Sequence, residues 1–83
     1  MSETTYNGWK NYETWNCALY INNEYPLYKS ATIFMKAYKG AKPYRDWVAL
    51  AGLDKQTTPD GCKWISDKLS YAELNEMMKA LNS

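Results

Sequence analysis

The chain lacks histidine altogether and has only two cysteines among its 83 residues. Without histidine, it lacks the side chain that most often serves as a general base near neutral pH and that most often binds zinc. Cys17 and Cys62 stand far apart and in no metal-ligand spacing. We interpret them as buried thiols in a reducing compartment, with one disulfide between them as the alternative. The sequence therefore predicts no metal and no cofactor.

Strong charge and long apolar runs are also missing. The net charge is +1. This value argues against a strongly basic nucleic-acid-binding protein and against a strongly acidic DNA mimic. No apolar run approaches the roughly 20 residues needed to span a bilayer. Residues 1–5 do not fit a signal peptide. We expect a soluble protein of the cytoplasm.

Catalytic motifs are absent as well. The chain has no Gly-x-Ser-x-Gly elbow and no glycine-rich loop for phosphate. The best carboxylate pair, Glu73 and Glu76, lies three residues apart on a predicted helix surface, where charged side chains are usually only solvated. Cys17 lies in the middle of a predicted helix without an activating partner. We predict that the protein is not an enzyme.

Aromatic residues are abundant by contrast, and tyrosine outnumbers phenylalanine by 8 to 1. A hydrophobic content of 46% is too high for a disordered chain. The length allows one small domain with a thin core, so we expect residues 1–83 to form a single unit with a frayed start at 1–8. Tyrosine suits half-buried positions at core edges and interfaces, because it joins apolar area to a hydroxyl.

Periodicity and capping signals predict an all-α bundle of about four helices, at 12–22, 26–39, 43–51 and 71–81. Segment 53–69 reads as irregular, since turn residues interrupt it. The short connection between the first two helices favours an antiparallel hairpin. The expected caps are Asn11 at the first helix, a capping box from Ser70 to Glu73 at the last, and Gly40 and Gly52 at the ends of the second and third.

The predicted first helix is amphipathic. Its apolar arc carries Trp15, and Asn16 and Tyr20 lie on the polar arc. We interpret Trp15, Trp47 and Trp64 as core residues. The rings near the N-terminus then exceed what a small core buries, and aromatic side chains dominate binding interfaces. The predicted protein-binding residues are Trp9, Lys10, Tyr12, Glu13, Asn16 and Tyr20.

A basic stretch supplies an alternative, in which the protein binds nucleic acid. Residues 28–45 hold five cations and no acid. Cations would contact phosphates, and interleaved rings would stack on unpaired bases. The simpler interpretation is a solvated face opposite an apolar one, and the stretch has only one arginine for reading bases. The residues of this alternative are Tyr25, Lys29, Lys36, Lys39, Lys42 and Arg45.

The string Gly8-Trp9-Lys10-Asn11-Tyr12-Glu13-Thr14-Trp15-Asn16 resembles the start of a family of small uncharacterised proteins of tailed phages, especially cyanophages, with related forms in bacteria and plasmids. Thr58-Pro59-Asp60-Gly61 and Ala72-Glu73-Leu74-Asn75-Glu76-Met77-Met78 resemble its end. The chain departs from the pattern at Cys17, where an aliphatic residue is commoner. The resemblance implies a phage or mobile-element origin and action in a host cytoplasm. It implies no activity and assigns no site residue.

Overall fold

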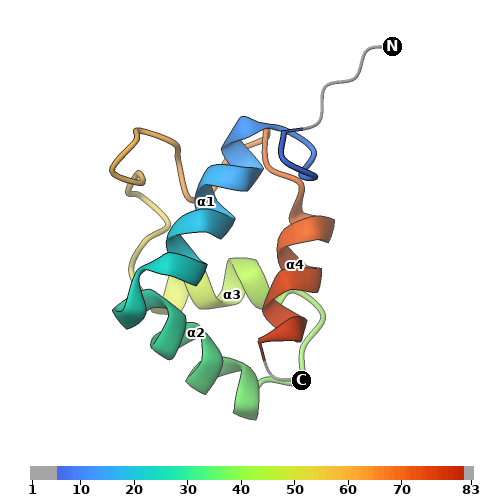
Figure 1. Ribbon diagram of the computed structural model, residues 1–83. Coiled ribbons are helices and arrows are strands. Elements are labelled where there is room, and N and C mark those ends of the chain that lie inside the picture. Colours follow the sequence, from blue (N-terminus) through green and yellow to red (C-terminus); the bar gives the residue numbers. More distant parts are fainter. Residues whose placement is uncertain (1–5, 82–83) are drawn as a thin grey trace.

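The computed structural model describes residues 6–81, and its regular structure is helical. In this range the chain forms α1 (Tyr12–Asn23), α2 (Tyr25–Ala37), α3 (Pro43–Leu50) and α4 (Tyr71–Ala80). The described part contains no sheet, only two isolated β-bridges. Figure 1 shows α1 and α4 upright, α3 between them and α2 across the lower end. The predicted all-α bundle is confirmed, and the largest error in a helix bound is two residues, at the end of α2 (39 against Ala37).

The predicted cap of the first helix is confirmed, and that of the last helix is confirmed in part. The Asn11 side chain accepts a hydrogen bond from the Thr14 amide at 2.9 Å, and the Ser70 hydroxyl accepts one from the Glu73 amide at 3.4 Å. The reciprocal half of the capping box is wrong. The Glu73 carboxylate accepts instead from the Lys10 amide at 2.7 Å, and the Ser70 amide donates to the Thr14 hydroxyl. Lys10 and Thr14 thus take the two groups, the Glu73 carboxylate and the Ser70 amide, that would pair with each other in a capping box.

The junction between α1 and α2 is a single residue, Glu24. Its amide donates to the Tyr20 carbonyl and its carbonyl accepts from the Tyr28 amide, each at 2.9 Å, so both helices share it. One residue cannot reverse the direction of the chain, and α2 runs across the end of α1 rather than back along it (Figure 1). The predicted antiparallel hairpin is therefore wrong.

The end of α3 is the glycine turn that the sequence predicts. Gly52 has a φ of +76°, which a residue with a side chain rarely adopts. The Gly52 amide donates to the Ala49 carbonyl at 3.2 Å, and the Leu53 amide donates to the Val48 carbonyl at 2.9 Å. These two bonds define a Schellman motif.

The end of α2 differs from the prediction at Gly40. The helix stops at Ala37, and the extended backbone of Tyr38 (φ −83°, ψ 134°) is its cap. Gly40 is needed for space instead, since a Cβ there would collide with the Tyr38 hydroxyl. That hydroxyl donates to the Asp46 carboxylate and accepts from the Lys42 amide, so an aromatic side chain closes this turn.

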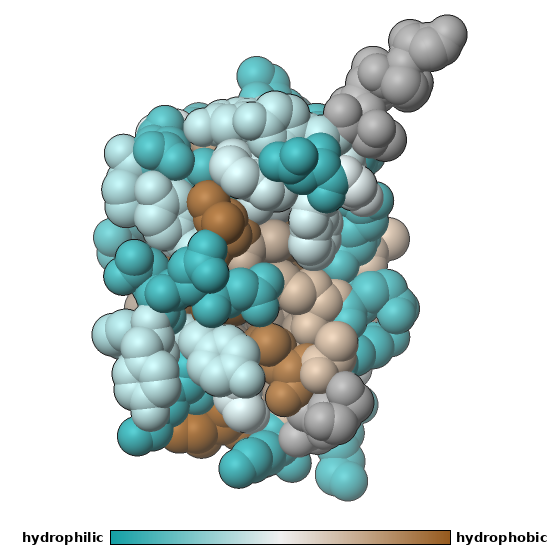
Figure 2. Space-filling view, viewed as in Figure 1, coloured by the Kyte–Doolittle hydropathy of each residue, from teal (hydrophilic) through white to brown (hydrophobic). Residues whose placement is uncertain are grey.

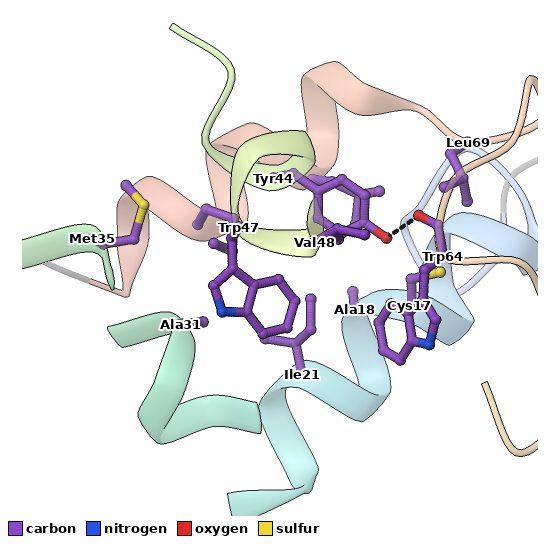
Figure 3. Close-up of a cluster of buried hydrophobic side chains, with 12 residues drawn as sticks. Cys17, Ala18, Ile21, Ala31, Met35, Tyr44, Trp47, Val48, Trp64 and Leu69 are labelled. Atoms are coloured by element: carbon purple, nitrogen blue, oxygen red, sulfur yellow. Dashed lines mark hydrogen bonds between the residues drawn. The ribbon is translucent and has the colours of Figure 1, made fainter. Parts of the chain in front are cut away.

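The core is built around Trp47, which is fully buried between α2 and Trp64 (Figure 3). Its indole N–H donates to the Ser30 hydroxyl at 3.1 Å, and its ring meets Trp64 edge-on at 6.5 Å between centroids. The Tyr44 hydroxyl donates to the Trp64 carbonyl at 2.6 Å (Figure 3). The core residues are Cys17, Ala18, Ile21, Ala31, Met35, Tyr44, Trp47, Val48, Trp64, Leu69, Leu74 and Met78.

Segment 53–69 is irregular, as predicted, and hydrogen bonds between its own backbone groups hold its shape. The Thr58 amide donates to the Cys62 carbonyl at 2.7 Å, next to a bridge between Thr57 and Lys63. We call residues 57–63 the covering loop, because it lies along α1 (Figure 1). The rest of the segment delivers Trp64 and Leu69 to the core.

The expected frayed start covered residues 1–8, of which 1–5 lie outside the described residues. From Tyr6 onward the chain forms a tight two-residue turn instead. The amides of Tyr6 and Trp9 donate to each other's carbonyls at 2.7 and 2.8 Å. Asn7 (φ +50°) and Gly8 (φ +89°) occupy the left-handed positions between them, as Asn-Gly pairs do in hairpin turns.

Both cysteines are buried free thiols, which confirms that interpretation over the disulfide. Burial raises the pKa of Cys17 from 9 to about 11. Its Sγ lies 3.6 Å from the Lys63 carbonyl oxygen, to which the thiol donates. The thiol is therefore held protonated, and its hydrogen bond joins α1 to the last residue of the covering loop.

This pKa predicts an alkaline loss of stability. Because the folded pKa lies above the unfolded one, the stabilisation is complete below pH 9 and is lost as the pH rises to about 11. The expected loss is about 2–3 kcal/mol of unfolding free energy. Urea unfolding of wild type and Cys17→Ala across this range measures it. Tyrosines and lysines titrate in both proteins, so an equal decline in the two would contradict the assignment to Cys17.

Candidate functional site

Three rings gather at the N-terminal end of α1, and we call Tyr6, Tyr12 and Trp15 the aromatic cluster. The ring of Tyr6 lies 5.3 Å from that of Tyr12, edge-on, and 4.8 Å from that of Trp15. Tyr12 and Trp15 are 5.6 Å apart. Tyr6 and Tyr12 keep 40% and 39% of their surface exposed. The cluster is thus ordered by its own contacts while two of its rings face outward.

Trp15 does not belong to the core, so its predicted position is wrong, whereas Trp47 and Trp64 are confirmed as core residues. Trp15 is half-buried, and the rings it contacts are those of the aromatic cluster. The predicted apolar arc of α1 was too wide, because it included Trp15. The residues of α1 that reach the core are Cys17, Ala18 and Ile21, a narrower stripe than the sequence suggests.

Asn16 is fully buried, so its prediction as a binding residue is wrong. Its side-chain oxygen accepts from the Thr58 hydroxyl at 2.5 Å, and its amide donates to the Asp60 carboxylate at 2.8 Å. The same Thr58 hydroxyl accepts from the Cys62 amide at 3.1 Å. The covering loop therefore buries the arc of α1 that was predicted to be polar and exposed.

Tyr20 and Glu13, two more predicted binding residues, are half-buried along this loop. Burial first, and hydrogen bonding with Asp60 second, raise the pKa of Tyr20. Glu13 lines a cavity of about 500 Å³ together with Cys62 and Lys68. Both side chains thus lie against the protein's own loop, and only part of their surface is accessible to a partner.

Trp9 and Lys10 lie beside α4. Trp9 is half-buried against the core, and it borders a hollow of about 420 Å³ with Glu76 and Met77. Lys10 has an exposed side chain, and its backbone amide is held by Glu73. The structure therefore places Lys10 and Tyr12 on the surface, and it leaves Trp9 partly accessible.

The residues of the nucleic-acid alternative all have exposed side chains. The ammonium of Lys29 lies 5.9 Å from the Tyr25 ring centre, and the guanidinium of Arg45 lies 5.3 Å from that of Tyr71. Within residues 6–81 the one ion pair joins Lys79 to Glu76, so these cations are not neutralised by partners. The residues of this alternative are spread over α2, α3 and the connection between these helices. They are Tyr25, Lys29, Lys36, Lys39, Lys42 and Arg45.

Tyr6 is the surface residue that the sequence reasoning missed, because it was placed in the frayed start. The signal was present in the Asn7-Gly8 pair between two aromatic residues, which favours a two-residue turn. Such a turn brings Tyr6 back toward the helix that follows. Its ring then contacts Tyr12 and Trp15.

The thiols show little chemical activation. Burial is the largest cause that raises the pKa of Cys62, as it is for Cys17, so both groups stay protonated near neutral pH. In the described range, no three Cys, Asp or Glu side chains are grouped so that they could hold a metal ion. None of the helices formed by residues 6–81 combines the length and the apolarity that crossing a bilayer requires.

The surface offers apolar contact in separate patches. Figure 2 shows brown, hydrophobic side chains on this face as islands among hydrophilic ones. Most of the large exposed hydrophobic residues are tyrosines, and two are aliphatic. The exposed set is Tyr6, Tyr12, Tyr25, Tyr28, Ile33 and Leu50.

Comparison with known protein families gives a match over nearly the whole chain. The model of a family of unknown function (DUF7249) matches residues 2–83. No curated protein and no solved structure matches it. The match extends over the N-terminal motif and over the residues that bury it, and the description of the family assigns no activity.

Proposed function

We propose that this chain, which belongs to the family of unknown function DUF7249, is a non-enzymatic accessory protein of a phage that binds a host or phage protein. The observation that carries the proposal is the exposed aromatic cluster. The phage origin and the host cytoplasm rest on the resemblance of the Asn-Tyr-Glu-Thr-Trp-Asn string.

Folding accounts for three polar residues of that string, Asn11, Thr14 and Asn16. The side-chain amide of Asn11 donates to the Lys68 carbonyl at 2.6 Å, and the Thr14 hydroxyl accepts from the Ser70 backbone amide at 2.9 Å. Asn16 holds the covering loop. The rings of Tyr12 and Trp15 have no such partner in the core. Their contact with Tyr6 leaves an aromatic surface that the fold does not require, which favours a role outside the chain.

The cluster has the properties of a binding anchor. Tyrosine and tryptophan supply large contact area with few rotatable bonds, so ordering them at an interface costs little entropy. The ring contacts and the turn between Tyr6 and Trp9 fix the cluster before any partner arrives. The exposed side chain of Lys10 adds a charged rim.

Recovery of partners from a lysate of the bacterial host tests this surface. We expect Tyr6→Ala with Tyr12→Ala to reduce the bound partner at least about tenfold, because central aromatic side chains dominate binding energy. Tyr28→Ala is the matched control, since Tyr28 is also 39% exposed but lies on α2. Identical partners and yields from the wild type and the double variant would contradict the proposal.

The nucleic-acid alternative stays a prediction. The exposed, unneutralised cations support it, because phosphates would meet no competing carboxylate in an ion pair. Two of the cations already lie over rings of the protein itself, Lys29 over Tyr25 and Arg45 over Tyr71. The spread of the cations over several elements makes this alternative the weaker of the two.

A further inference from the structure

A groove between α2 and the end of α3 is not used by the proposed function. Its volume is about 450 Å³. The hydrogen bond from the Trp47 indole to the Ser30 hydroxyl joins the two helices at its base. The lining is formed by Pro26, Lys29, Ser30, Ile33, Phe34 and Leu50.

The groove displays the two large aliphatic side chains that the described surface exposes most. Ile33 is 57% exposed and Leu50 is 75% exposed. Leu50 is the last residue of α3, and the Schellman turn at Gly52 fixes the backbone behind it. Neither side chain is needed to close the core, and together they border one hollow instead of standing apart.

The lining of this groove carries positive charge, and the carboxylate of Asp46, one turn before Leu50 on α3, is engaged by the Tyr38 hydroxyl. Lys29 is the one charged residue in its lining, and its ammonium lies above the Tyr25 ring at the outer edge of α2. Lys36 follows seven residues later, which places it on the same face of the helix. Neither lysine forms an ion pair within residues 6–81, and residues 28–45 contain no acid.

We infer that this groove docks an acidic amphipathic helix of a partner protein. The apolar side of that helix would cover Ile33, Phe34 and Leu50, and its carboxylates would meet Lys29 and Lys36. A partner helix with apolar anchors in a groove is a recurring mode of recognition, and complementary charge fixes its orientation. The inference is independent of the aromatic cluster, since Tyr12 begins α1 and Pro26 lies in α2, beyond the other end of α1, whose 12 residues span about 18 Å.

The hollow shape favours a helix over an anionic membrane, which would also match apolar and basic groups. A bilayer surface is flat on this scale, so it cannot fill a concavity between two helices. A partner helix can place one side chain between Ile33 and Leu50. Vesicle binding therefore belongs among the outcomes that contradict the inference.

The test titrates two synthetic peptides into the full nitrogen-labelled chain and follows its amide signals. One peptide carries leucines at helical i, i+3, i+4 and i+7 positions with glutamates elsewhere, and the other replaces each glutamate by lysine. We expect saturable binding of the acidic peptide, with shifts centred on α2 and Leu50. Leu50→Asp should weaken it at least about tenfold, because a carboxylate would be buried without a partner. Lys29→Glu should reverse the preference between the peptides.

Two features make the outcome decisive. Ile33 and Leu50 are exposed, so their aspartate variants should melt like wild type, and Ala72→Asp serves as a control at an exposed residue of α4. Absence of saturable binding, equal binding of both peptides, or shifts centred on the aromatic cluster would overturn the inference. Tighter binding to phosphatidylglycerol vesicles than to the acidic peptide would also overturn it. Failure of the groove leaves the Tyr6 and Tyr12 experiment unaffected.

Discussion

Trp47→Ala is expected to lower the free energy of unfolding by about 3–5 kcal/mol, the cost of deleting a large buried ring. Trp47 is fully buried, it contacts Trp64, and its indole joins α3 to α2 through Ser30. The stability of a domain of this size is of the order of 5 kcal/mol, so the variant should be largely unfolded. Thermal melting followed by circular dichroism measures the loss of helix.

Two further variants separate packing from hydrogen bonding. Trp47→Phe keeps much of the apolar volume but loses the N–H that donates to Ser30. Ser30→Ala keeps the ring and removes its acceptor, which should cost about 1–2 kcal/mol. If Trp47→Ala melted within a few degrees of wild type, the ring would not be the centre of the core.

Asn16→Asp is expected to destabilise the protein by about 3 kcal/mol or more at neutral pH, because it buries a carboxylate next to the carboxylate of Asp60. The introduced group has almost the volume of the amide, so packing is unchanged. Burial and the like charge raise its folded pKa above the unfolded value. Stability should thus be present at low pH and be lost as the pH rises through the raised pKa.

Urea unfolding at neutral pH and near pH 4, the ordinary carboxyl range, measures this effect. The matched control is Asn23→Asp, the same change at an exposed asparagine of α1. If both variants lost the same stability, or if the loss did not depend on pH, Asn16 would not hold the covering loop in the way described.

Local signals explain why the helices were predictable. Asn11 caps the first amides of α1, and Gly52 supplies the positive φ that ends α3, so a short stretch of sequence contains the whole cause. Gly40 shows the limit of this reasoning. Its neighbour Tyr38 ends α2 earlier by bonding to Asp46, eight residues away. A glycine near a helix end looks the same in both cases.

Long-range partners explain what the sequence could not predict about the candidate site. Asn16 has a polar side chain and lies on the polar arc of the first helix, so the sequence pattern predicts that it is exposed to solvent. The covering loop has no periodic pattern that would predict where it packs. Its Asp60 nevertheless accepts a hydrogen bond from Asn16, which lies 44 residues earlier in the sequence. Tyr12 and Lys10 were predicted as binding residues, and their side chains are exposed, although the N-terminal turn packs Tyr6 against Tyr12.

Ile33 and Leu50 show a further reason. Ile33 lies on the lysine face of α2, where one aliphatic residue among cations is easily read as incidental. Its significance depends on Leu50, which the fold brings alongside from another helix. Only the packing of α2 against α3 turns two separate residues into one groove.

The bonds of the first residues of α1 have a consequence for synthesis on the ribosome. Lys10, Asn11 and Thr14 bond to groups that lie 63, 57 and 56 positions later. When its first helix has just emerged from the ribosome, a nascent chain therefore exposes polar groups whose native hydrogen-bond partners have not yet been translated. Closure of such distant pairs slows folding, so the native contacts of this exposed aromatic end cannot all form until residue 73 has been translated.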